Sequence, residues 1–129
     1  ERQIAAHVFE KYGHEFVFLT DYPSTVRPFY HMRHADNQAL TNSYDLIWRG
    51  TEITTGAQRE HRVDVLIEQI KSKGLEPEGL QTYIDFFRYG APTHGGFGMG
   101  LLRVIMLLLH QPNIREVGYL FRGPNRLEP

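Results

Sequence analysis

The sequence predicts an α+β fold in which helices flank an antiparallel β-sheet. A hairpin pattern spans Ser43–Thr55, and two helical patterns follow over Arg62–Lys73 and Pro77–Tyr89. Because strands of the hairpin type are mixed with helices along the chain, we expect the sheet to be antiparallel. The length of 129 residues suits one domain or a piece of one.

The composition excludes several classes of protein. With 14 Lys and Arg against 15 Asp and Glu, the net charge of −1 gives no basic surface that alone would indicate nucleic-acid binding. The absence of cysteine excludes a disulfide scaffold, a thiolate metal site and a cysteine nucleophile. No stretch approaches the roughly 20 apolar residues of a membrane span, and we see no export leader. We therefore expect a cytoplasmic protein without membrane contact.

The first third of the chain predicts one helix followed by extended segments. Ile4, Val8 and Phe9 recur at near-helical spacing, and Gly13 is a plausible helix end. Residues 15–19 and 25–29 then form two extended pieces, which a turn at residues 21–24 separates. Residues 31–41 lack periodicity and are expected to form a polar loop.

The hairpin and the two helices have local signals of their own. Tyr44, Leu46 and Trp48 alternate with other residues at the period of a half-buried strand, and Gly50 offers a turn before a run rich in β-branched residues. Gly74 ends the first helical pattern, and Pro77 stands early in the second, where proline is tolerated.

The C-terminal third predicts a glycine-rich loop, an apolar helix and a short strand. The loop covers residues 91–100, the helix residues 101–110 and the strand residues 116–121. Because the helix is apolar on every side apart from Arg103, we expect the helix to be buried and Arg103 to lie in a desolvated region of low dielectric.

Asp45 and Glu52 are candidate metal ligands. If Arg49 and Gly50 form a two-residue turn, the two carboxylates lie on the same face as diagonal neighbours, roughly 7–8 Å apart. At that distance they could hold magnesium, with phosphate oxygens completing the coordination. The alternative is a pair of solvated carboxylates, one of them bridged to Arg49.

Arg59 is a candidate carboxylate-binding residue. It follows Gly56, which allows the backbone to approach a ligand closely, and a guanidinium can bind a carboxylate through two parallel hydrogen bonds. The alternative is a surface arginine at the start of a helix.

Arg103 is a candidate phosphate-binding residue. It lies near the start of the apolar helix, after Gly95, Gly96, Gly98 and Gly100, and a helix N-terminus with an arginine suits a phosphate. The alternative is a salt bridge to an internal carboxylate. His94, within the same loop, is compatible with ligand contact or with loop packing, and no histidine pair has metal-binding spacing.

Taken in order, these segments resemble class II aminoacyl-tRNA synthetases, and most closely the aspartyl-tRNA synthetases of the archaeal and eukaryotic type. The resemblance rests on KYGHEFVFLTDYPSTVRPFY, NSYDLIWRGTEITTGAQREH and YIDFFRYGAPTHGGFGMGLLRVIMLLL, the last of which contains the third signature motif of the family. It implies that residues 1–129 are the C-terminal part of the catalytic domain. Motifs 1 and 2 and the anticodon-binding domain would then lie outside these residues.

The resemblance also implies roles for individual residues. Asp45 and Glu52 match the acidic residues that hold magnesium against ATP, and Thr55 falls where the family usually has a serine that assists that site. Arg59 matches the arginine that reads the side-chain carboxylate of aspartate. Arg103 matches the arginine that grips the γ-phosphate, and Gly98 and Gly100 give ATP access.

The implied reaction is the ATP- and Mg²⁺-dependent activation of L-aspartate to aspartyl-adenylate, followed by transfer to tRNA, in a homodimeric enzyme. One alternative is an asparaginyl-tRNA synthetase, which has a similar GxQRE stretch. Another is a non-catalytic relative that acts as a binding or regulatory module. Leu102 is consistent with this last alternative because the family commonly has an acidic residue there, and Phe121 stands in a departure from the usual FPRDP near the end.

Overall fold

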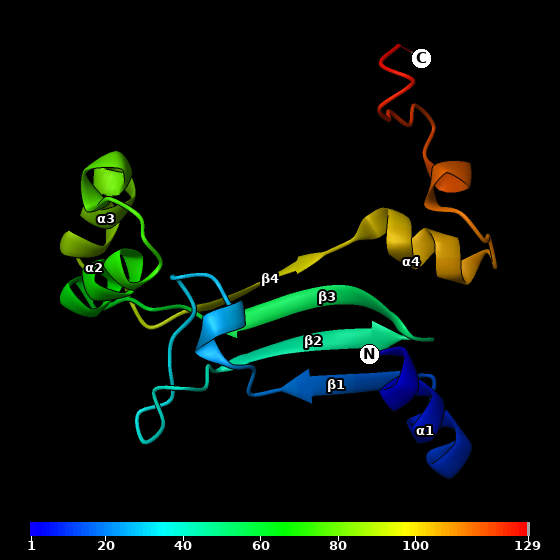
Figure 1. Cartoon of the computed structure of the whole chain (residues 1–129), viewed down its shortest axis with the longest axis horizontal. Coiled ribbons are helices and arrows are strands. Elements are labelled where there is room, and N and C mark those ends of the chain that lie inside the picture. Colours follow the sequence, from blue (N-terminus) through cyan, green and yellow to red (C-terminus); the bar gives the residue numbers. More distant parts are fainter. Residues whose placement is uncertain (129) are drawn as a thin grey trace. The chain divides into compact units, whose positions relative to one another are not determined.

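A computed structural model shows one sheet of four antiparallel strands in the order β1-β2-β3-β4, accompanied by four α-helices (Figure 1). The structure describes residues 1–128. The strands are β1 (Phe16–Thr20), β2 (Ser43–Trp48), β3 (Thr51–Gln58) and β4 (Gly95–Met99). The α-helices are α1 (Arg2–Tyr12), α2 (Val63–Ser72), α3 (Gln81–Arg88) and α4 (Leu101–Leu108). Three short 3₁₀ helices are η1 (Ser24–Val26), η2 (Pro77–Leu80) and η3 (Ile114–Val117). The expected α+β class is confirmed.

The chain forms two compact units, each assembled from separate stretches of sequence. The first unit consists of Glu1–Phe18, Leu46–Thr54 and the chain from Met99 onward. The second unit consists of Leu19–Asp45 and Thr55–Gly98.

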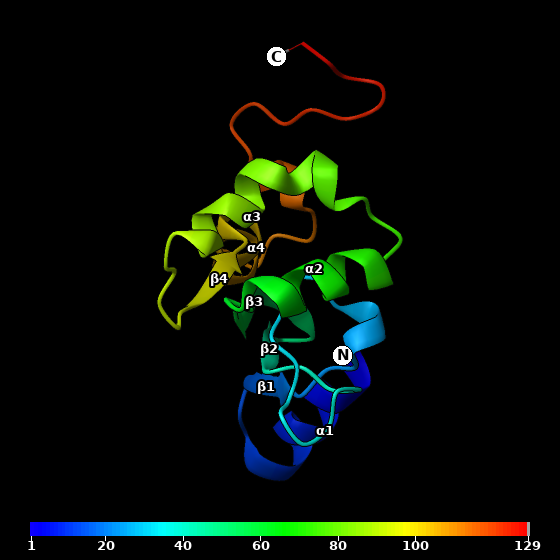
Figure 2. The same cartoon turned by 90° about the vertical axis from the view of Figure 1, so that its left-hand side faces the viewer.

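The core of the second unit lies between α2 and α3, which lie beside each other (Figure 2). Leu66 and Ile70 from α2 meet Ile84 and Phe87 from α3, and all four side chains are buried. These residues recur at the helical period that predicted both helices. The second predicted helix is interrupted, because its first turn, at Pro77, is the 3₁₀ helix η2.

The hairpin turn of the first unit is held by side chains as well as by its backbone. Arg49 and Gly50 both have positive φ, 47° and 79°, as in the two-residue turns that match strand twist. The Arg49 guanidinium donates to Glu15 Oε1 at 2.8 Å and to the carbonyl of Leu107, near the end of α4, at 3.3 Å. Trp48 Nε1 donates to the other Glu15 oxygen at 3.2 Å. The turn is thereby tied to the segment before β1 and to α4.

Three expectations about local structure are wrong. Residues 24–26, which cover the end of the predicted turn and the start of the second extended piece, form η1, which fits the turn chemistry of the preceding Pro23. Part of the expected glycine-rich loop is β4, whose pairing depends on distant backbone partners: Arg59 N donates to His94 O, and Gly100 N to Ile53 O. The tail contains η3 in place of the expected strand at residues 116–121.

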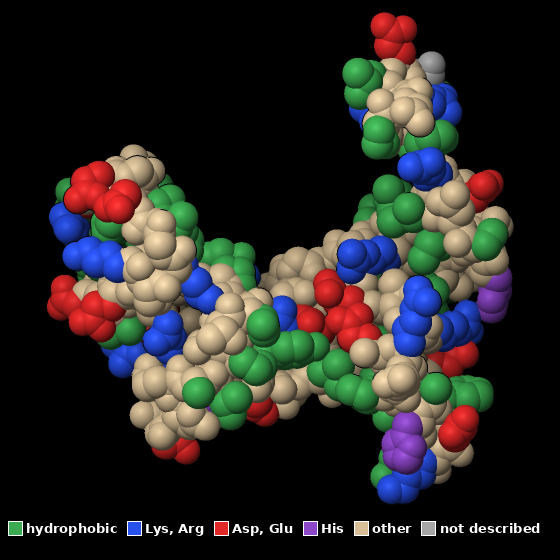
Figure 3. Space-filling model, in the orientation of Figure 1, with side chains coloured by type: hydrophobic (Ala, Val, Ile, Leu, Met, Phe, Trp, Pro, Cys, Tyr) green, Lys and Arg blue, Asp and Glu red, His purple; other side chains and the backbone are tan. Residues whose placement is uncertain are grey.

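The expectation that α4 is a buried helix is also wrong. None of its residues is buried, and Leu101 and Leu108 are 66% and 63% exposed. Figure 3 shows hydrophobic side chains at the surface over this part of the chain. The reason is that η3 covers one side of α4, so only residues 104–107 are half-buried. No helix within residues 1–128 combines the length and apolar character of a membrane span.

Candidate functional site

Arg59 lies in an open cavity of about 430 Å³ in the second unit. Strand β3 ends at Gln58, so Arg59 is the first residue beyond it. The cavity is lined by aromatic rings, one histidine, Arg59 and two glycines: Tyr30, Tyr83, Phe87, His94, Gly95, Gly96 and Arg59. One cation among aromatic walls is an arrangement that suits a small anionic ligand.

The Arg59 guanidinium has an unused donor. Its Nη1 is buried, and among residues 1–128 it has no hydrogen-bond partner. The guanidinium carbon lies 4.8 Å from the centre of the Tyr30 ring, a cation–π contact that leaves the in-plane N–H groups available. A buried donor without a partner is costly, so an acceptor that enters the cavity would be bound favourably. Arg59 is therefore not the surface arginine of the alternative interpretation.

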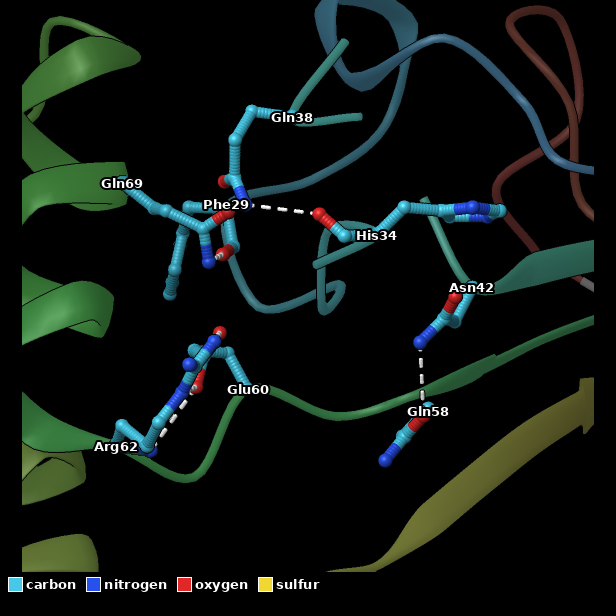
Figure 4. A network of polar contacts seen from close by, with 8 residues as sticks. All are labelled: Phe29, His34, Gln38, Asn42, Gln58, Glu60, Arg62 and Gln69. Atoms are coloured by element: carbon cyan, nitrogen blue, oxygen red, sulfur yellow. Dashed lines mark hydrogen bonds and ion pairs between the residues drawn. The ribbon is translucent and has the colours of Figure 1, made fainter. Parts of the chain in front are cut away.

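The residues on either side of Arg59 are both held by polar contacts (Figure 4). Asn42 Nδ2 donates to Gln58 Oε1 at 2.9 Å. Glu60 is fully buried, and its carboxylate accepts from Arg62 Nε and Nη2, each at 2.9 Å. These hydrogen bonds with Arg62 oppose the desolvation of Glu60 and keep the pKa of that carboxyl below its usual value. The backbone at Arg59 is thus fixed from both sides.

His94 stacks on Phe87, with ring centres 6.0 Å apart, and its Nδ1 lies 2.8 Å from the carbonyl of Pro92. The structure therefore shows the loop-packing role for His94, and it places the same ring in the wall of the cavity. Tyr83, another residue of the wall, packs edge-on against Phe87 with ring centres 5.0 Å apart. Burial raises the pKa of the Tyr83 hydroxyl, so this tyrosine is neutral near pH 7.

Asp45 lies in a separate polar cluster of the second unit and is 2% exposed. Its Oδ2 is 2.7 Å from Arg27 Nη2, and the Arg27 guanidinium lies 3.7 Å from the centre of the Tyr22 ring. Burial raises the pKa of Asp45, but hydrogen bonds from Arg27, Thr55 and Tyr22 outweigh it and hold the pKa below the usual value. The carboxylate is therefore ionised, and Arg27 balances its charge. Thr55 also forms a side-chain hydrogen bond with Asp45 here.

His31 is a buried residue of the second unit, and two arginines, Arg59 and Arg27, act on its charge. Burial, together with the charges of Arg59 and Arg27, lowers its pKa from 6.5 to about 4, although Asp45 opposes the shift. His31 is thus uncharged in the folded protein at neutral pH.

We expect the stability of the protein to fall in mild acid because of His31. Between pH 6.5 and about 4 the unfolded chain binds a proton at this residue and the folded chain does not, so lowering the pH favours unfolding. The stabilisation is fully present above pH 6.5, and we expect about 2 kcal/mol of it to be lost at pH 5. Denaturant unfolding at pH 8 and pH 5 measures the loss. His31→Gln should show a smaller pH dependence, and an equal dependence in parent and variant would refute the assignment.

Arg103 and Glu52 face a second cavity, of about 670 Å³, in the first unit. Arg103 Nη1 donates to the backbone carbonyl of Glu52 at 2.8 Å and to its Oε1 at 3.2 Å. The side chains are 45% and 33% exposed, so the expectation of a desolvated Arg103 is wrong. It is wrong because α4 itself is not buried. The alternative of a salt bridge to a carboxylate is what the structure shows, and Glu1, Arg2 and Thr51 add further polar groups to the cavity wall.

The two glycines expected near the nucleotide have different surroundings. Gly98 has open space where a side chain would stand. Gly100 precedes α4, and a side chain there would meet Arg103, with the added carbon 3.3 Å from Cδ. Gly100 therefore allows the Arg103 side chain to fold back over the start of the helix.

Each of the two units brings some of the predicted residues together. Asp45 joins Thr55, and Glu52 joins Arg103, while Arg59 has a cavity of its own. Sequence reasoning missed the contact of Arg27 with Asp45, 18 positions away, and that of Tyr30 with Arg59, 29 positions away. No local pattern marks such contacts, and only the pairing of distant segments could have revealed them.

Residues 1–122 match the family model described as tRNA synthetases class II (D, K and N). The chain belongs to this family. It is 50% identical over its whole length to the aspartate–tRNA(Asp/Asn) ligase of Aeropyrum pernix, and it covers 29% of that protein. It is also 50% identical over its whole length to a cytoplasmic aspartate–tRNA ligase of Arabidopsis thaliana, of which it covers 23%.

Solved structures of class II synthetases have the same fold. The aspartyl-tRNA synthetase of Entamoeba histolytica superposes with a TM-score of 0.94 at 42% identity, over 98% of this chain and 26% of that one. The asparaginyl-tRNA synthetase of the same organism, in complex with asparaginyl-adenylate, has a TM-score of 0.87 at 32% identity. That match covers all of this chain and 30% of the other. The chain thus spans less than a third of the length of these relatives.

Proposed function

We propose that this chain is part of an aspartate–tRNA ligase and contributes contacts to aspartate and ATP. The observation that carries the proposal is the Arg59 donor, which is buried without a partner in a cavity of amino-acid size. A fixed guanidinium suits the second carboxylate of aspartate and leaves the α-carboxylate for reaction. The names of the relatives support the same substrate.

In the proposed reaction the α-carboxylate of aspartate attacks the α-phosphate of ATP, and the bond to pyrophosphate breaks. A terminal ribose hydroxyl of the tRNA then attacks the activated carbonyl, and AMP leaves. Residues of this chain act by binding and orienting the reactants, and no protein nucleophile is needed. Arg59 orients aspartate, while Arg103 binds the distal phosphate with access provided by Gly98 and Gly100.

Magnesium would be held by Glu52, with Asp45 and Thr55 as the other predicted contributors. Glu52 fits this role because it offers a partly exposed carboxylate oxygen in a polar cavity, and oxygen ligands are what magnesium requires. Asp45 is ionised but already balanced by Arg27. Bound magnesium would neutralise phosphate charge during the reaction.

The proposal extends to the complete protein. We propose that residues 1–129 are the C-terminal part of the catalytic domain of a homodimeric enzyme, with motifs 1 and 2 and the anticodon-binding domain elsewhere in the protein. We also propose a cytoplasmic location, as in the name of one relative from Arabidopsis thaliana.

The test is ATP–pyrophosphate exchange by the full-length protein with aspartate and with asparagine. Exchange that depends on aspartate supports the proposal. Exchange that depends on asparagine would assign an asparaginyl-tRNA synthetase. No exchange with either amino acid would favour the non-catalytic binding module.

We expect Glu52→Gln to raise the magnesium concentration needed for half-maximal exchange by roughly tenfold or more, because a charged ligand is replaced by a neutral one of the same shape. A magnesium titration at saturating ATP measures the shift. Glu10→Gln, at an exposed position of α1, is the matched control. An unchanged magnesium titration for Glu52→Gln would show that Glu52 does not bind magnesium and serves only as the ion-pair partner of Arg103.

A further inference from the structure

The Arg59 guanidinium lies against Tyr30 and against the bare backbone of Gly96. The ring of Tyr30 faces its central carbon at 4.8 Å. A methyl carbon built on Gly96 would lie 3.4 Å from both Nε and Nη2. A side chain larger than methyl at this position would therefore have to displace the guanidinium.

The backbone around Arg59 cannot take up such a displacement. Arg59 N donates to the carbonyl of His94 at 2.9 Å, and Arg59 forms an antiparallel bridge with His31, next to Tyr30. Gln58 and Glu60 are each held by a further partner (Figure 4). The orientation of the guanidinium is thus set by its contacts with Tyr30 and Gly96, since its main chain is already fixed.

These contacts leave one edge of the guanidinium unused. Arg59 Nη1 is buried and lacks a hydrogen-bond partner among residues 1–128. Arg59, Tyr30 and Gly96 all line the same cavity. Arg59 also brings its positive charge to this part of the cavity wall. A carboxylate would gain both a hydrogen bond from Nη1 and attraction to the positive charge of the guanidinium, whereas a carboxamide would gain only the hydrogen bond.

We propose that Tyr30 and Gly96 are positioning residues, which hold the Arg59 guanidinium in the plane where it meets the side-chain carboxylate of the amino acid and so set the preference for aspartate over asparagine. This inference rests on the proposed function. It adds two residues that do not themselves donate a hydrogen bond to the substrate. Their contribution is to the orientation of Arg59, because a guanidinium that can swing toward solvent loses the paired geometry on which carboxylate recognition depends.

The test compares kcat/KM for aspartate with kcat/KM for asparagine in the full-length protein. Tyr30→Leu removes the ring face, and Tyr30→Phe keeps it. Gly96→Val introduces branched carbons beside the guanidinium in a residue type that strands favour, and Gly96→Ala adds one methyl at contact distance. We expect the aspartate-to-asparagine ratio to fall tenfold or more for Tyr30→Leu and Gly96→Val, mainly through KM for aspartate. It should stay within about threefold of the parent for Tyr30→Phe and Gly96→Ala.

The ratio is informative even where a variant folds poorly, because a smaller folded fraction lowers both efficiencies equally. An unchanged ratio for Tyr30→Leu and Gly96→Val in a protein that activates aspartate would overturn this inference and leave the proposed function intact. A fall for Tyr30→Phe equal to that for Tyr30→Leu would also overturn it, since the hydroxyl would then be the active group. A parent that activates neither amino acid would overturn the proposed function and this inference together.

Discussion

Replacement of Arg59 by leucine is expected to lower kcat/KM for aspartate, by a factor that corresponds to about 2–4 kcal/mol of lost transition-state binding. It should also abolish the preference for aspartate over asparagine. The loss is large because the substrate carboxylate would enter the cavity with no cation to meet it, and an unpaired buried charge is costly. The physical origin is local: Arg59 Nη1 is a buried donor without a partner in residues 1–128. Steady-state exchange kinetics with both amino acids measure the effect.

Two comparisons separate this effect from a general defect. The KM for ATP should be unchanged in Arg59→Leu, because Arg59 and Arg103 line different cavities. Arg88→Leu, which removes an exposed arginine at the end of α3, should leave the aspartate preference as it is. Retained aspartate affinity in Arg59→Leu would contradict the role assigned to this residue.

The elements with strong local signals were predicted correctly from the sequence. The first helix ends at Gly13, which has a φ of 69° and donates its N–H to Phe9 O, and the hairpin turns at Arg49 and Gly50. The buried face of β2 differs from the predicted one, because Asp45 and Ile47 are buried while Tyr44 and Leu46 are only half-buried. Strand β4 was missed because three of its five residues are glycine, whose weak strand preference hides the pairing. That strand forms through backbone hydrogen bonds to β3, which is about 40 positions away in sequence.

The candidate site residues could be named from the sequence, but the residues that they contact could not. The residue types at Arg59, Glu52 and Arg103 indicate their chemistry, but the contacts that define their state depend on tertiary structure. The prediction that Arg103 is buried was wrong for this reason. The apolar sequence of α4 indicates that burial of the helix would be favourable, but it does not show which segment would cover it. The same limit applies to Arg27, which no sequence pattern connects to Asp45.

Replacement of Arg103 by alanine is expected to raise the barrier of the activation step by about 2–4 kcal/mol, as does the removal of other charge-stabilising donors. The proposed γ-phosphate would lose a charged contact, so ATP-dependent exchange should fall while the KM for aspartate changes little. Arg115→Ala, at an exposed position on η3, is the matched control. Exchange by Arg103→Ala equal to that of the parent would exclude phosphate binding by this residue.

The ion pair between Arg103 and Glu52 adds a sharper expectation. The guanidinium that is proposed to meet phosphate lies 3.2 Å from the carboxylate that is proposed to hold magnesium. ATP and magnesium would then separate two groups that neutralise each other, and removal of either group leaves its partner without a counter-charge. We therefore expect the effects of Arg103→Ala and Glu52→Gln on exchange to be non-additive, with a coupling of about 0.5–3 kcal/mol in a double-mutant cycle. Additive effects would show that the two residues act independently during activation.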